Sequence, residues 1–101
     1  MSNNNKRDEF VKKLHQQIDE INERIDELEE QAQDAESQAQ EEYEARLVDL
    51  REQRDEFQEK ATELENASGE AWKSLQDGVN TAWQELSTAV SDARDKFKEA
   101  V

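Results

Sequence analysis

The sequence predicts an all-α fold in which a long helix and a shorter amphipathic helix pair as an antiparallel coiled-coil hairpin. The 101 residues include no Pro and only two Gly, so few positions interrupt a helix. Apolar residues recur at steps of three and four over the first two thirds of the chain, which is the spacing of a heptad seam. The last third repeats every eleven residues, a length close to three helical turns.

The first part of this single domain is expected to be a flexible N-terminus, residues 1–8, followed by a long helix over 9–65. Nothing between Phe10 and Glu65 breaks a helix, and acids lie four residues before bases at several places, the favourable order on a helix surface. The heptad seam slips once, between Ala39 and Leu50, which locally unwinds a supercoil. The large apolar side chains at the start of the seam are Phe10, Leu14, Ile18, Ile21, Ile25 and Leu28.

The turn of the hairpin is expected at 66–70, because Asn and Gly favour helix ends and Ser68 suits the start of a new helix. A continuous helix that tolerates Gly69 is the alternative. The second helix is expected over 71–101, where the repeated frame Ala-Trp-x-x-Leu-x-x-small-Val puts its apolar positions on one face. This face, which serves either hairpin packing or lipid binding, comprises Trp72, Leu75, Val79, Trp83, Leu86, Val90 and Phe97.

Self-association is predicted from the unequal lengths of the two helices. A second helix of about 30 residues covers only half of the first at 1.5 Å per residue. The stripe from Phe10 to Leu28 would then have no partner within the chain, and each large side chain left in water forfeits roughly 1.5–3 kcal/mol. We therefore expect a homodimer or higher homo-oligomer joined through residues 10–32.

Composition disfavours several classes of function. The chain has 27 Asp and Glu, 13 Lys and Arg, one His and no Cys, for a formal net charge of −14. This charge opposes nucleic-acid binding and simple docking on anionic membranes. The absence of Cys removes thiolate metal sites and redox chemistry. We expect no catalytic residues, no cofactor and no metal, and the polar N-terminus without a secretory signal favours the cytoplasm.

Three groups of residues could have either a chemical role, in catalysis or binding, or a purely structural role. His15, with Asp19 one turn away, could touch a metal, but one imidazole cannot complete a four-helix carboxylate site, so a surface role is favoured. Paired Glu residues would need a water-excluding cleft to act as acid and base. Trp72 and Trp83 fit either the core or a membrane interface. A mimic of nucleic acid that captures a basic protein is a further reading of the acidic surface.

Three motifs have a counterpart in a known family: Glu42-Tyr43, Ala67-Ser68-Gly69-Glu70-Ala71-Trp72 and Gly78-Val79-Asn80-Thr81-Ala82-Trp83. At these residues the chain resembles a family of small bacterial and cyanobacterial coiled-coil proteins described as stress-response proteins. The resemblance implies a helical protein associated with stress and carries over no catalytic residues. The resulting expectation is a non-enzymatic interaction or scaffold protein with an unidentified protein partner. The alternative is a peripheral lipid-binding amphipathic helix protein, since an eleven-residue period also resembles exchangeable apolipoproteins.

Overall fold

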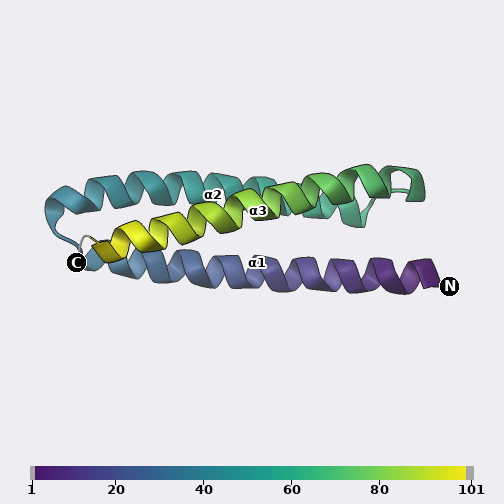
Figure 1. The fold of residues 1–101 in the computed structure, drawn as a ribbon, viewed down its shortest axis with the longest axis horizontal. Coiled ribbons are helices and arrows are strands. Elements are labelled where there is room, and N and C mark those ends of the chain that lie inside the picture. Colours follow the sequence, from purple (N-terminus) through teal and green to yellow (C-terminus); the bar gives the residue numbers. More distant parts are fainter. Residues whose placement is uncertain (1, 100–101) are drawn as a thin grey trace.

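The computed structural model describes residues 2–99, which form three helices: α1 (Ser2–Asp34), α2 (Ser37–Glu65) and α3 (Gly69–Glu99). They lie side by side in a rod of 55 × 17 × 16 Å. The chain runs up, down and up, so that α1 and α3 are parallel and α2 is antiparallel to both (Figure 1). The all-α class is therefore confirmed, and the expected pair of helices is replaced by a bundle of three.

The expectation of one helix over 9–65 is wrong at Ala35 and Glu36, where the chain folds back on itself. Glu36 is extended, with φ −65° and ψ 154°, and its side chain makes no capping hydrogen bond. No helix-breaking residue marks this connection. Packing stabilises the folded-back chain, because it covers the apolar stripe of α1. Burial of each large side chain contributes roughly 1.5–3 kcal/mol of stability.

The ends of the helices also differ from expectation. Residues 2–8, expected to be flexible, belong to α1. The turn predicted at 66–70 is shorter, because α3 already begins at Gly69. The amide of Asn66 donates a 3.2 Å hydrogen bond to the carbonyl of Thr62, and the Asn66 side chain donates a second bond to the same oxygen at 3.0 Å. The end of the predicted last helix, residues 100–101, lies outside the described residues.

One apolar core runs between the three helices. Near the start of α2 and the end of α3, the rings of Tyr43 and Phe97 stack with centroids 3.8 Å apart. The Tyr43 hydroxyl donates to the carbonyl of Phe97 at 3.4 Å. Further along, Phe57 of α2 contacts Trp83 of α3 with centroids 5.5 Å apart. The buried residues are Leu14, Ile21, Ile25, Leu28, Ala32, Tyr43, Leu47, Leu50, Phe57, Ala61, Leu64, Val79, Leu86, Val90, Ala93 and Phe97.

Candidate functional site

The apolar stripe of α1 is covered within the chain. Leu14, Ile21, Ile25 and Leu28 are only 1–2% exposed, and Phe10 and Ile18 are partly buried against the same core. The premise that this stripe lacks an intrachain partner is therefore wrong. One straight helix over 9–65 would leave part of this stripe bare, whereas the fold brings α2 and α3 against α1.

The apolar face of α3 points into the same core. Val79, Leu86, Val90 and Phe97 are buried. Trp72, Leu75 and Trp83 are partly buried and pack against the buried set. The two groups of residues singled out by the sequence thus form one core. In this fold the apolar face of α3 serves packing, which is the first of the two roles expected for it.

The interface between α1 and α3, called here the α1–α3 seam, is the least extensive of the three helix interfaces. Near the start of both helices, Phe10 meets Trp72 edge to face, with ring centroids 5.9 Å apart and planes inclined by 75°. The guanidinium of Arg7 lies 4.5 Å from the centroid of the Trp72 ring. A cation over an aromatic face is attracted by the ring quadrupole, so Arg7 and Phe10 together fix one end of α3 onto α1.

Arg7 also ties α1 to the connection between α2 and α3. Its guanidinium donates to the carbonyl of Glu65 at 3.2 Å and to the carbonyl of Ala67. Carbonyls at the C-terminus of a helix lack intrahelical partners and carry partial negative charge. Arg7 therefore supplies the cation and donors that the end of α2 needs. Arg7 was included in the expected flexible N-terminus, and nothing in its local sequence indicates this role.

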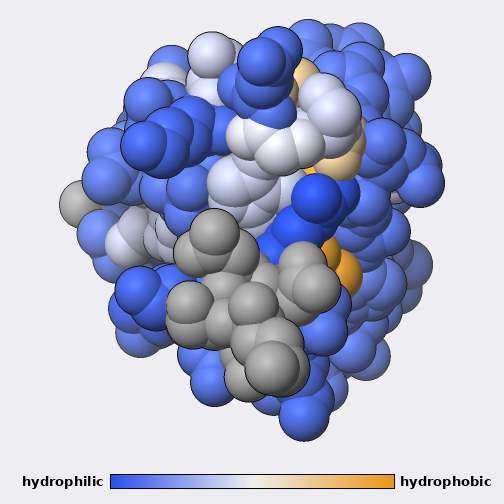
Figure 2. Space-filling model, turned by 90° about the vertical axis from the view of Figure 1, so that its right-hand side faces the viewer, coloured by the Kyte–Doolittle hydropathy of each residue, from blue (hydrophilic) through white to orange (hydrophobic). Residues whose placement is uncertain are grey.

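The end hollow is a surface depression of about 440 Å³ beside this cluster, lined by Lys6, Arg7, Phe10, Gly69, Trp72, Lys73 and Gln76. It combines two partly buried aromatic rings with three basic side chains. Figure 2 shows this end of the molecule, where pale and orange residues gather near the middle of a mostly hydrophilic face. The end hollow is therefore apolar and basic in a chain whose formal net charge is −14.

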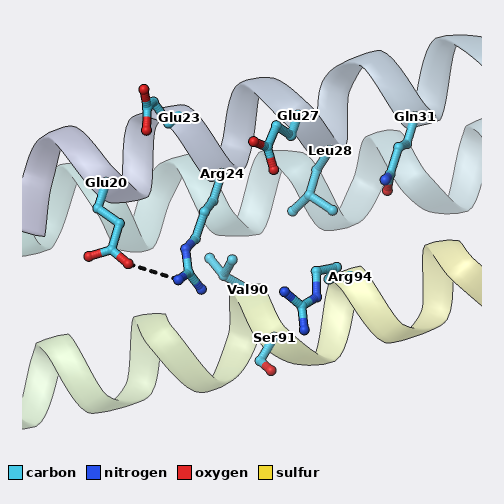
Figure 3. A pocket seen from close by; sticks show the side chains of 9 residues that line it. All are labelled: Glu20, Glu23, Arg24, Glu27, Leu28, Gln31, Val90, Ser91 and Arg94. Carbon is cyan, nitrogen blue, oxygen red and sulfur yellow. Dashed lines mark hydrogen bonds and ion pairs between the residues drawn. The ribbon is translucent and has the colours of Figure 1, made fainter.

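A second depression, of about 330 Å³, lies further along the α1–α3 seam. Arg24 of α1 and Arg94 of α3 extend into the space between the helices, and Leu28 and Val90 lie between them (Figure 3). Arg24 is held by Glu20, one turn earlier, at 2.8 Å. Glu20, Glu23 and Glu27 of α1 lie on the same rim. This depression is mainly polar, and its carboxylates offset the charge of its two Arg side chains, so the end hollow is the stronger binding candidate.

Polar contacts between α1 and α2 include the only imidazole. His15 hydrogen-bonds Glu65, and the two side chains are 63% and 32% exposed. Further along, Arg51 pairs with Glu29, and Arg54 donates to the side chain of Asn22 at 3.3 Å. These partners are far apart in sequence, so no local pattern predicts them. Ion pairs near the surface, such as His15 with Glu65 and Arg51 with Glu29, contribute little stability individually.

The geometry also bears on metal binding and on membrane insertion. Among residues 2–99, the structure has no cluster of three or more His, Asp or Glu side chains that could bind a metal ion. Within the same range, no helix has an apolar stretch long enough to cross a bilayer. The fold and its surface define the class of protein as an acidic up-down-up three-helix bundle with an apolar, basic hollow at its end.

Comparison with known proteins gives no match to a family model, to a curated protein or to a solved structure.

Proposed function

We propose that this protein is a non-enzymatic interaction protein of the stress response that binds a protein partner at the end hollow. The observation that supports this most is the set of Phe10 and Trp72 beside Lys6, Arg7 and Lys73. Aromatic and Arg side chains are enriched at the centres of protein interfaces. The association with stress rests on the family resemblance.

The charge of the hollow indicates the chemistry of the partner. Partly buried rings offer apolar area, while Lys6 and Lys73 are exposed basic groups at its rim. A partner segment with an apolar side chain flanked by carboxylates would satisfy both. Complementary charges of this kind raise the association rate and select the partner more than they add affinity.

Photo-crosslinking in stressed cells tests this proposal. A crosslinking amino acid at Gln76, which lines the hollow, is expected to trap a discrete protein. The matched position is Glu59, exposed on α2 and away from the hollow. The crosslink from position 76 should be lost with Lys73→Glu and retained with Lys60→Glu, an equal change of charge on α2. Equal products from positions 76 and 59, or no effect of Lys73→Glu, would contradict the proposal.

Lipid binding is the second candidate, because α3 is the most amphipathic of the three helices. Its apolar face is buried at Val79, Leu86 and Val90, so α3 would have to leave the core before it met a membrane. We expect little blue shift of Trp fluorescence when anionic vesicles are added at physiological salt. A marked blue shift of Trp fluorescence would favour this candidate over the first, because it would show that α3 had left the core.

A further inference from the structure

The two connections between the helices differ in how well the sequence specifies them. The connection from α2 to α3 has the two Asn66 hydrogen bonds to Thr62, and the amide of Trp72 donates to the carbonyl of Ser68 at 3.0 Å. Glu70 lies in the first turn of α3, where an acid is favourable. Specific residues therefore end one helix and begin the next.

The connection from α1 to α2, called here the hinge, is Ala35 and Glu36. Its backbone is bonded much as the other connection is, since the Glu36 carbonyl accepts from the amides of Ala39 and Gln40 at 2.9 and 3.0 Å, but the charges at the two helix ends do not favour a break. The last turn of α1 contains no base and ends in Asp34, whose charge is unfavourable at a helix C-terminus. The first turn of α2 contains no acid, and Glu36 makes no side-chain cap. The side chain of Gln40 does donate to the carbonyl of Gln33 at 3.1 Å across the hinge. Both hinge residues favour a helix, Ala most of all.

The buried faces of α1 and α2 are in phase across the hinge. If residues 35 and 36 were helical, at about 100° per residue the buried positions of both helices would fall within an arc of about 100°. These positions are Leu14, Ile21, Ile25, Leu28, Ala32, Tyr43, Leu47, Leu50, Phe57, Ala61 and Leu64. A hairpin does not require this alignment, because its two helices meet face to face whatever their relative phase. A single straight helix with one continuous apolar stripe does require it.

We propose that the hinge straightens and that two such chains exchange their α1 helices to form a domain-swapped dimer. In each half, α1 of one chain packs between α2 and α3 of the other. The contacts of the closed monomer are thereby remade between chains, and two weakly specified turns become helix. Exchange of an identical element is a route to dimers that requires little new surface, and short hinges favour it. The partner is a second copy of this chain, independently of the proposed function at the end hollow.

Charge opposes this dimer in a way that salt should relieve. Residues 26–44, which surround the hinge, contain nine carboxylates and no base: Asp26, Glu27, Glu29, Glu30, Asp34, Glu36, Glu41, Glu42 and Glu44. Straightening brings the hinge regions of two chains together at the centre of the dimer. The Debye length falls from about 10 Å at 0.1 M salt to about 3 Å at 1 M. We therefore expect salt to favour the swapped dimer over the closed monomer.

Two substitutions at Glu36 bias the hinge in opposite directions. Glu36→Pro suits the closed hinge, since φ is −65° and proline fixes φ near that value, but it breaks a straight helix. Glu36→Ala favours the straight helix and removes no capping bond. By sedimentation equilibrium at 1 M salt, Glu36→Ala should raise the dimer association constant about 2- to 5-fold. Glu36→Pro should lower it at least about 100-fold, because each dimer contains two hinges.

Intrachain distances identify the swap itself. Because the chain lacks Cys, spin labels attach only at Gln16→Cys and Glu63→Cys, two exposed positions on α1 and α2. Labelled chains are diluted with unlabelled ones so that only pairs within one chain contribute. The monomer should give a short distance set by a cross-section of 17 × 16 Å. The dimer should give about 70 Å, the rise of a straight helix over the intervening residues.

Three results would overturn the proposal. They are a dimer that keeps the short distance, a Glu36→Pro chain that dimerises as readily as Glu36→Ala, and a Glu36→Ala chain that stays monomeric near 1 mM in 1 M salt. Circular dichroism shows whether Glu36→Pro folds. If it does not, two glycines inserted between Ala35 and Glu36 replace it, because they relax the closed turn and disfavour a straight helix. The Lys73→Glu variant should dimerise normally, so this proposal and the proposed function fail separately.

Discussion

Replacement of Ile25 by Ala tests whether α1 belongs to the same core as α3. Ile25 is 1% exposed, and the change removes about three carbon atoms from the core. At about 0.8 kcal/mol per carbon the loss of burial is about 2.4 kcal/mol. The cavity left behind brings the expected fall in the free energy of unfolding to about 3–4 kcal/mol. Because the core lies within one chain, this loss should not depend on protein concentration in the monomer range.

Urea unfolding followed by two signals measures this loss. Circular dichroism reports all three helices, whereas Trp fluorescence reports α3, which contains Trp72 and Trp83. Both signals should shift together, since one cooperative core unfolds as a unit. The control is Val48→Ala on α2, where the side chain is 49% exposed, with a change within about 0.5 kcal/mol. A Trp transition that stays in place while the helical signal shifts would refute the shared core.

Substitutions at three further residues test individual contacts. Arg7→Lys keeps the charge but loses the planar guanidinium over Trp72 and the fork that reaches two carbonyls, so we expect a loss of about 1 kcal/mol and a shift in Trp emission. Unfolding of Arg7→Leu, which loses the charge as well, should show a larger loss. Tyr43→Phe removes a 3.4 Å bond to the Phe97 carbonyl, and calorimetry should show a loss at the low end of about 0.5–1.5 kcal/mol because the rings stay stacked. His15→Gln should change the free energy of unfolding by less than about 1 kcal/mol, since the His15 side chain is 63% exposed. A greater change would mean that its pair with Glu65 is coupled to the core.

The sequence predicted which side chains are buried better than it predicted the path of the chain. Spacing in steps of three and four marks Leu14, Ile21 and Ile25 as one face, and each of them is buried. Periodicity depends only on local helical geometry, so it identifies an apolar face without identifying what covers that face. For this reason the stripe was assigned to a second chain, whereas the fold covers it with α2 and α3.

The break between α1 and α2 could not be predicted from the sequence, for a different physical reason. Neither Ala35 nor Glu36 disfavours a helix, so local propensity indicates continuation. The fold-back is decided by the apolar area buried when α1 meets the other helices, a gain that a local pattern does not contain. The turn after Asn66 was predicted because capping residues act within a few positions. Contacts such as Arg7 with the carbonyl of Ala67, or His15 with Glu65, join residues fifty or more positions apart and have no local signature.

The unequal extent of the helix interfaces has a consequence for how the chain folds during its synthesis. The interface between α2 and α3 is the most extensive of the three, and α3 follows α1 and α2 along the chain. During synthesis α1 therefore emerges with an apolar stripe for which only part of the cover exists. Its Asp and Glu residues outnumber its bases, so like charge opposes contact between two chains in which this stripe is still uncovered. The acidic surface of the folded rod therefore also disfavours association of incompletely folded chains.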